Sequence, residues 1–309
     1  MTNRAFVRII FLGTGGGLPT PKRNLPATAL QIGSEIILFD CGEGTQRQFM
    51  SSNASFMKIQ KIFITHFHGD HFLGLPGLIQ SMNFVGRKKK LEIYGPPGIV
   101  EIVHKIVNLG YFSPGFEIST MELKPGESLH FDGYDVLAIE VDHLVPAFGY
   151  ILKEVARPGR FLPEKAKILG LEEGPLFRAL QKGHNVEVNG KLITPEMVTG
   201  PPRPGIKIAI SGDTRPCDRF AEAAENSDLI IHEATLDSSL REQATEYGHS
   251  TAKEAAMIAL RAHAGALYLN HISNRYEDAS ILENEARMIF PNSFITEDLM
   301  EVTLRHRKE

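Results

Sequence analysis

Residues 65–71 carry the side chains best suited to chemistry in this chain. Three imidazoles and one carboxylate directly follow the apolar run 62–64: His66, His68, Asp70 and His71. Burying four such groups without partners would cost several kcal/mol of desolvation, which a divalent metal ion would offset. Imidazole and carboxylate ligands without a thiolate favour a catalytic zinc site over a closed structural one.

The spacing within this cluster indicates more than one metal ion. His66 and His68 are two residues apart, so in an extended segment their side chains point to the same side. Asp70 and His71 are adjacent and point in different directions, which makes them available to a second ion. The cluster therefore predicts two metal ions and a hydrolytic water.

Apolar runs that read as strands alternate with stretches that read as helices. The expected strands are 7–12, 27–32, 36–40, 61–64, 91–94, 136–141, 149–152, 207–210, 229–232 and 266–269. The expected helices are 45–52, 98–109, 219–224, 251–262 and 279–290. Thr45 with Gln48, and Thr251 with Glu254, match the capping-box pattern of helix starts. The alternation predicts an α/β chain with at least one mixed sheet.

Three further candidate ligands each follow a predicted strand. His143 comes after 136–141, Asp213 after 207–210 and His271 after 266–269. The ends of strands are where α/β proteins gather functional groups. We assign one zinc to His66, His68 and His143, and the other to Asp70, His71 and His271. Asp213 has two carboxylate oxygens and can bridge the ions. Water held between two such ions becomes a nucleophile near neutral pH.

The composition fits a soluble globular protein with a full core. Of 309 residues, 42% are hydrophobic and 23% are charged. The net charge is −4, so any nucleic-acid contact must come from a local basic patch. The two cysteines, Cys41 and Cys217, fit a reducing cytoplasm, although a disulfide between them stays open. No apolar run approaches a membrane span and no signal-peptide pattern is present, so we expect a cytoplasmic protein without membrane contact.

Residues 157–205 differ in composition from the rest of the chain. From 151 to 205 there are seven of the 18 prolines and seven glycines. Nine basic and six acidic residues give this span a formal charge of +3. Because the whole chain has a net charge of −4, the rest of the chain carries −7. We predict a single domain, 1–309, with an inserted, protruding and flexible arm at 157–205. A plain surface excursion is the alternative.

The pattern H-x-H-x-D-H after a buried strand, followed by His143, Asp213 in S-G-D-T and His271, resembles the metallo-β-lactamase superfamily. The resemblance spans nearly the whole chain. It implies an αβ/βα four-layer sandwich with the metals at one edge of two packed sheets. It leaves the substrate open, because hydrolases of lactams, thioesters and nucleic acids share this pattern.

Four shorter strings resemble the ribonuclease Z family in its short form. They are G-T-G-G-G-x-P-T-x-x-R-N from residue 13, G-P with L-x-x-G across 174–183, I-H-E-A-T at 231–235 and G-H-S-T at 248–251. The resemblance implies a zinc-dependent endoribonuclease, with two Zn²⁺ per subunit, that removes the 3′ trailer from precursor tRNA. It also implies a 3′-hydroxyl on the tRNA, a 5′-phosphate on the trailer, and a homodimer.

The same resemblance implies roles for individual residues. Asp70 would accept the proton of the attacking water, and His249 would contact the scissile phosphate and protonate the leaving oxygen with support from Glu233. His249 also precedes the capped helix 251–262, whose N-terminal N–H groups attract phosphate. A plain turn residue is the alternative for His249. The candidate RNA-binding residues are Lys22, Arg23, Asn24, Gly174, Pro175, Arg178 and Lys182.

Three alternatives stay open. Another hydrolase of the same fold, such as a sulfatase or a cyclic-nucleotide phosphodiesterase, would keep the seven ligands but would not need the arm. A non-catalytic RNA-binding relative would be expected to lose ligands, whereas all seven are present. Manganese could occupy the same ligands as zinc.

Overall fold

The computed structural model describes residues 6–306. The chain forms two compact units. The first, called the body, comprises Met1–Lys153 and Ile206–Glu309; the second, called the arm, is Glu154–Gly205. The arm therefore begins slightly before the predicted residue 157 and ends at the predicted residue 205. Among the described residues, no helix has the length and apolar character needed to cross a membrane.

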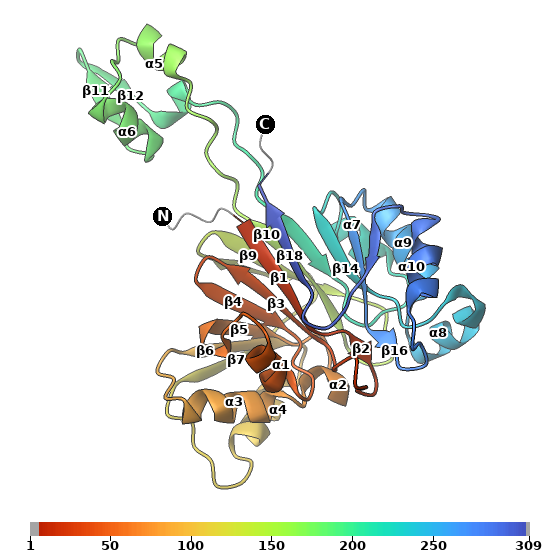
Figure 1. Cartoon of the computed structure of the whole chain (residues 1–309). Helices are drawn as coiled ribbons and strands as arrows, with labels where there is room; N and C mark the ends of the chain where they lie inside the picture. The colour runs from red at the N-terminus through yellow and green to blue at the C-terminus, as the bar shows by residue number, and fades with distance from the viewer. Residues whose placement is uncertain (1–5, 307–309) are drawn as a thin grey trace. The chain divides into compact units, whose positions relative to one another are not determined.

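The body contains two seven-stranded mixed sheets (Figure 1). The first has the order β18-β1-β3-β4-β5-β6-β7 and the second has the order β17-β15-β14-β13-β10-β9-β8. The first sheet consists of β1 (Phe6–Gly13), β3 (Ala27–Ile32), β4 (Glu35–Phe39), β5 (Ile59–Phe63), β6 (Leu91–Gly95), β7 (Ile118–Glu122) and β18 (Glu301–Arg305). The second consists of β8 (Ser128–Phe131), β9 (Tyr134–Glu140), β10 (Phe148–Glu154), β13 (Lys207–Ile210), β14 (Leu229–Glu233), β15 (Leu267–Asn270) and β17 (Ser293–Ile295).

Helices cover the outer face of each sheet. The first sheet is accompanied by α1 (Thr45–Ser51), the one-turn α2 (Gly69–Phe72), α3 (Leu75–Phe84) and α4 (Ile99–Val107). The second is accompanied by α7 (Asp218–Ala223), α8 (Arg241–Tyr247), α9 (Ala252–Arg261) and α10 (Ser280–Arg287). Short segments complete the body: β2 (Gly15–Gly16), β16 (Ile272–Ser273), and the 3-10 turns η1 (Phe56–Lys58) and η3 (Ser238–Leu240).

Apolar side chains on the two faces of each strand enter different cores, which explains the layers. In β1, Ile9 and Phe11 belong to the core between the sheets, whereas Ile10 and Leu12 pack beneath α1, α3 and α4. A third core lies between the second sheet and α7, α9 and α10. This period-2 alternation with both faces buried is what a sheet covered on both sides requires. The arrangement confirms the predicted αβ/βα sandwich.

All ten predicted strands and all five predicted helices occur, with small shifts at their ends. The capping box of Thr251 and Glu254 is confirmed at the start of α9. The capping box predicted at Thr45 is wrong, because Gly44 is the N-cap residue of α1 and has a left-handed φ of 83°. Thr45 Oγ1 instead donates to Gly42 O at 2.6 Å. The prediction missed α3, α8 and several edge strands, such as β7, β8 and β18.

The arm has its own small apolar core. Its elements are α5 (Pro163–Ile168), α6 (Pro175–Gln181), β11 (Val186–Val188), β12 (Lys191–Ile193) and the 3-10 turn η2 (Pro195–Val198). Phe177 and Leu180 of α6 pack with Val186 and Ile193 of the hairpin. Arg157 and Arg203 exchange two backbone hydrogen bonds, of 2.8 and 2.9 Å, so the two ends of the arm lie side by side.

Strand ends of both sheets position the site. The parallel strands β13, β14 and β15 end next to one another, so Asp213, Glu233 and His271 gather at one edge. In the other sheet β5 leads directly into residues 64–68, which have neither helical nor strand structure, and then into α2. Asp70 and His71 therefore lie in the single turn of α2, which explains why these adjacent side chains point in different directions.

Candidate metal centre

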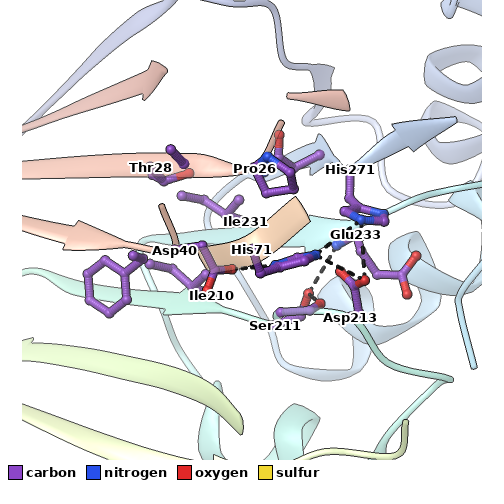
Figure 2. Close-up of a pocket in the computed structure, with 14 residues that line it drawn as sticks. Pro26, Thr28, Asp40, His71, Ile210, Ser211, Asp213, Ile231, Glu233 and His271 are labelled. Carbon is purple, nitrogen blue, oxygen red and sulfur yellow. Dashed lines mark hydrogen bonds and ion pairs between the residues drawn. The ribbon is translucent and has the colours of Figure 1, made fainter. Parts of the chain in front are cut away.

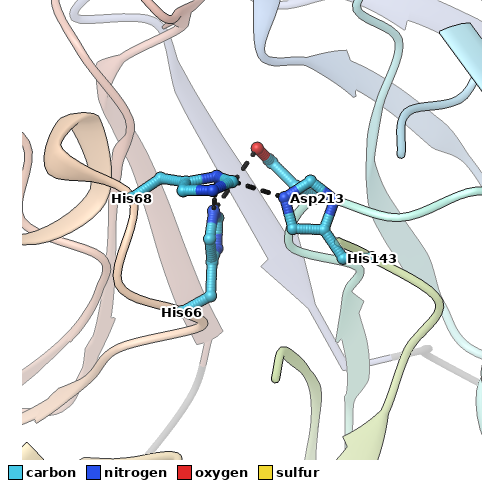
Figure 3. A group of neighbouring side chains, drawn as sticks. All are labelled: His66, His68, His143 and Asp213. Carbon is cyan, nitrogen blue, oxygen red and sulfur yellow. Dashed lines mark hydrogen bonds and ion pairs between the residues drawn. The ribbon is translucent and has the colours of Figure 1, made fainter. Parts of the chain in front are cut away.

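Three predicted ligands form a first group. His66 Nε2 lies 3.1 Å from His68 Nδ1, which lies 3.2 Å from His143 Nε2 (Figure 3). Asp213 Oδ2 is 3.7 Å from His66 Nε2. A tetrahedral zinc ion with ligands at about 2.0–2.1 Å keeps neighbouring ligand atoms about 3.3 Å apart. The spacing of these nitrogens therefore fits one shared ion.

Three others form a second group. His71 Nε2 lies 3.3 Å from His271 Nε2, which lies 3.4 Å from Asp70 Oδ2. Asp213 Oδ2 is 3.2 Å from both His71 Nε2 and His271 Nε2 (Figure 2). Because Asp213 also approaches His66, its carboxylate lies between the two groups. The structure thus brings together all seven predicted ligands in groups that could hold metal ions, with the carboxylate of Asp213 next to both groups.

The charge states of His66 and Asp213 suit metal ligation. Burial, with the charge of His71, lowers the pKa of His66 well below its usual value, so this imidazole is neutral. Burial would raise the pKa of Asp213, but His271 and His71 outweigh it and hold this pKa well below its usual value. A neutral imidazole and an ionised carboxylate are the forms that bind metal ions. Burial lowers the pKa of His71, but Asp213 and Asp40 outweigh it and raise this pKa well above its usual value, so His71 must lose a proton to bind an ion.

Hydrogen bonds from the Nδ1 atoms of two predicted ligand histidines fix the orientation of their rings. His71 Nδ1 donates to Asp40 Oδ2 at 2.8 Å, and His143 Nδ1 donates to Gly248 O at 2.8 Å. Thr65 also donates to Asp40, from its backbone N at 2.8 Å and from Oγ1 at 2.9 Å. Such partners fix the tautomer and orientation of a metal-binding histidine. Sequence reasoning missed Asp40, although its position at the end of the predicted strand 36–40 is the same signal that identified Asp213.

The glycine-rich segment after β1 contacts the second group of ligands. Gly17 N donates to Asp70 Oδ2 at 2.8 Å. β2 pairs with β16, which places Gly16 against the ring of His271. A Cβ atom on Gly16 would lie 2.4 Å from His271 Cε1, so only glycine fits there. The glycines thus allow the backbone to approach a predicted metal ligand.

Replacing Gly16 with alanine is expected to displace His271 and to weaken metal binding by the second group about 10–100-fold, the usual cost of disturbing the support of a ligand. Chelator competition would measure this change. Gly200→Ala is the control, because a Cβ at this arm position meets only backbone atoms of Arg160, at 3.8 and 3.9 Å. Equal metal affinity in the two variants would contradict this role of Gly16.

His249 and Glu233 form a buried ion pair beside the ligands. His249 Nδ1 donates to Glu233 Oε1 at 3.0 Å and lies 3.9 Å from Asp213 Oδ2. Burial lowers the pKa of His249, but the charge and hydrogen bond of Glu233 outweigh it and raise this pKa to about 9. The structure therefore places a protonated imidazole next to the metal ligands, with the partner acid predicted from the sequence.

The predicted RNA-binding residues near the N-terminus have different surroundings. Arg23 Nη1 donates to Thr14 Oγ1 at 2.7 Å and to Thr296 O at 2.6 Å. Asn24 Nδ2 donates to Glu43 O at 3.0 Å, whereas Lys22 is exposed. Arg23 and Asn24 thus stabilise the conformation of the loop, whereas the side chain of Lys22 is exposed to solvent. Their contact with RNA stays a prediction.

The other predicted RNA-binding residues lie in the arm. Gly174 and Pro175 begin α6, with Pro175 in its first turn. Arg178 and Lys182 are exposed on this helix and at its end. These four residues belong to the separate unit Glu154–Gly205, and their contact with RNA also stays a prediction.

Two packed sheets with outer helices and a histidine–aspartate centre at one edge define a hydrolase of the metallo-β-lactamase fold. A metallo-β-lactamase fold protein from Bacillus subtilis, YhfI, has the same fold, with a TM-score of 0.70 and 20% identity over 96% of this chain and 99% of that one.

Comparisons with known proteins identify the family within this class. The chain is 49% identical over 304 residues to a Ribonuclease Z of Methanosarcina acetivorans, covering 98% of this chain and 100% of that protein. The chain therefore belongs to the ribonuclease Z family of endoribonucleases. The crystal structure of human tRNase Z, short form, matches with a TM-score of 0.71 and 30% identity over 96% of this chain and 98% of that one. A family model described as anti-Pycsar protein Apyc1 matches residues 7–150, a segment that ends before Asp213, Glu233, His249 and His271.

Proposed function

We propose that this protein cleaves the 3′ trailer from precursor tRNA, leaving a 3′-hydroxyl on the tRNA and a 5′-phosphate on the trailer. The observation that carries the proposal is the convergence of two ligand groups on Asp213 with the protonated His249 at the same edge. The two groups would hold two zinc ions per subunit. When bound, the ions would lower the pKa of a water and stabilise charge on the phosphate.

Three side chains would carry out the proton transfers of the proposed reaction. Burial would raise the pKa of Asp70, but the neighbouring His271 and His71 outweigh it and hold this pKa well below its usual value. Asp70 is therefore ionised, as the acceptor of the proton from the attacking water must be. His249 would donate its proton to the leaving 3′-oxygen of the tRNA. Glu233 would keep His249 protonated and fix its ring.

The arm supplies the charge that an acidic protein needs to bind RNA. Arg178 and Lys182 are exposed on α6, and the span 151–205 carries a formal charge of +3. Contacts from such residues to phosphates supply affinity without reading the sequence. We therefore assign the arm to tRNA binding rather than to catalysis.

The direct test is incubation with a 3′-extended precursor tRNA, with and without a chelator, followed by mapping of the cut. We expect a single chelator-sensitive cut at the 3′ side of the mature tRNA sequence. Cleavage of a cyclic nucleotide with no cut in the precursor would favour the alternative phosphodiesterase.

Metal analysis of the purified protein is expected to find about two zinc ions per chain, because the seven ligands make two groups. Elemental analysis after mild purification measures this number, and manganese is counted in the same sample. Fewer than one metal ion per chain would contradict the assignment of the ligands.

We also propose a homodimer and a cytoplasmic location. Phe84 at the end of α3 and Tyr111 after α4 are almost fully exposed. Asn83 accepts a hydrogen bond of 2.6 Å from Gly115 N, which ties the segments that carry these two rings. Exposed aromatic rings at neighbouring positions are typical of a protein interface. The cytoplasmic location rests on the proposed function alone.

Replacing Phe84 with aspartate is expected to shift the protein from dimer to monomer, because a charge cannot be buried there without a partner. Light scattering measures the mass directly. Phe6→Asp serves as the control, since Phe6 is an exposed aromatic on β1. A monomeric wild type, or an unchanged dimer in the Phe84 variant, would exclude this surface.

A further inference from the structure

The hydroxyl of Thr235 joins the metal centre to the His249–Glu233 pair. Thr235 Oγ1 lies 2.9 Å from His271 Nδ1 and 2.8 Å from Glu233 Oε2. Thr235 follows β14 and His271 follows β15, which are adjacent parallel strands with Glu233 opposite Asn270. The sheet therefore brings the three side chains together from separate parts of the chain.

The direction of these hydrogen bonds follows from elementary chemistry. An ionised carboxylate can only accept, so the single hydroxyl proton of Thr235 must point to Glu233 Oε2. The contact with His271 then requires Nδ1 of the ring to carry the proton and to donate to Thr235 Oγ1. His271 Nε2 is consequently left with a free lone pair, and it is Nε2 that faces Asp70 and Asp213. Thr235 thus selects the tautomer of His271 that can bind a metal ion.

The other carboxylate oxygen of Glu233 is hydrogen-bonded to His249. Glu233 Oε1 accepts from His249 Nδ1 at 3.0 Å and from Thr214 N at 2.9 Å. On the other side, Thr235 N also donates to Oε2, at 3.2 Å. The carboxylate is therefore held at both oxygens, and its plane sets the direction of the His249 ring.

We propose that Thr235 is a positioning residue that couples the metal-binding form of His271 to the orientation of Glu233 and His249. The inference rests on the proposed function, because it gives His271 to a metal ion and His249 to the leaving oxygen. It adds a hydrogen-bonded chain, His271–Thr235–Glu233–His249, through which the metal centre and the proton donor are aligned together.

The test compares Thr235→Val, which keeps the shape and removes the hydroxyl, with Thr235→Ser, which keeps the hydroxyl. For the valine variant we expect about 10–100-fold weaker binding of one of two zinc ions in chelator competition. We also expect kcat on precursor tRNA to fall at least about tenfold with KM within about twofold, because the hydroxyl contacts His271 and Glu233 rather than a predicted RNA-binding residue. Serine should restore zinc affinity and kcat.

A double-mutant cycle with His249→Gln tests the coupling. If Thr235 acts partly through Glu233 and His249, the valine substitution should reduce kcat less in the His249→Gln background than in the wild type. Additive losses would overturn the coupling. Wild-type zinc affinity in the valine variant, or equal losses in the valine and serine variants, would overturn the role of the hydroxyl. A wild type that cuts no precursor would defeat the proposed function instead, and zinc competition would still decide the role of Thr235.

Discussion

Replacement of Asp70 with alanine is expected to abolish cleavage of precursor tRNA while the fold persists. The carboxylate approaches His271 Nε2 at 3.4 Å and His71 Nε2 at 3.6 Å, and it accepts from Gly17 N at 2.8 Å. Its removal takes away a predicted metal ligand and the predicted proton acceptor at once. Loss of general-base assistance alone costs about 10²–10⁴-fold in rate, so the combined loss should exceed that range.

Single-turnover cleavage of a 3′-extended precursor measures the rate, and thermal unfolding followed by circular dichroism measures the fold. The control is Asp237→Ala, a buried carboxylate that binds Ser239 and Tyr276 rather than the ligand groups. We expect this variant to lose stability but to keep most of its activity at a temperature where it is folded. Cleavage by the Asp70 variant at the wild-type rate would remove Asp70 from the mechanism.

Deletion of the arm is expected to cripple cleavage of precursor tRNA and to spare hydrolysis of a small phosphodiester. Arg157 and Arg203 are hydrogen-bonded neighbours, so a short glycine linker can replace the residues between them. The predicted metal ligands all lie in the body, and the arm has its own core, so the ligand groups should survive the deletion. We expect kcat/KM on the precursor to fall at least about 10²-fold, because the lost phosphate contacts supply affinity.

Bis-nitrophenyl phosphate, which has no tRNA part for the arm to bind, reports on the metal centre alone. Its hydrolysis should stay within about twofold of the wild type. The double variant Arg178→Ala with Lys182→Ala is an intermediate test that keeps the arm, and it should weaken precursor binding and lower its salt dependence. Equal losses on both substrates after deletion would mean that the arm is structural.

Much of the fold could be predicted from local patterns. Strands such as β3 and β13 appear at their predicted positions because an apolar run bounded by turn residues reports burial directly. Edge strand β18 was missed because its exposed and partly buried positions alternate and both of its end residues are charged. The false capping box at Thr45 shows the limit of such reasoning. Gln48, its expected partner, instead donates to Asp298 Oδ2 at 2.6 Å, 250 residues away.

Asp298 illustrates what local patterns do not contain. Its carboxylate accepts from Thr14 N, Thr14 Oγ1 and Asn24 N as well as from Gln48. Asp298 therefore holds both ends of the glycine-rich loop, at Thr14 and Asn24. The sequence around Asp298 contains no pattern that would predict this role. Burial raises its pKa, and the hydrogen bond from Asn24 N and that of Thr14 oppose this.

The sequence by itself determined which residues can bind metal ions and the class of chemistry they support. It did so because histidine and aspartate are rare at the ends of buried strands unless they have partners. Only the tertiary structure decided how Asp213 lies between the two ligand groups, why Gly16 must lack a side chain, and which proton His271 carries. These properties depend on contacts between residues far apart in the chain, such as His71 with His271, which are 200 positions apart. Sheet pairing creates those contacts, and a one-dimensional pattern does not encode them.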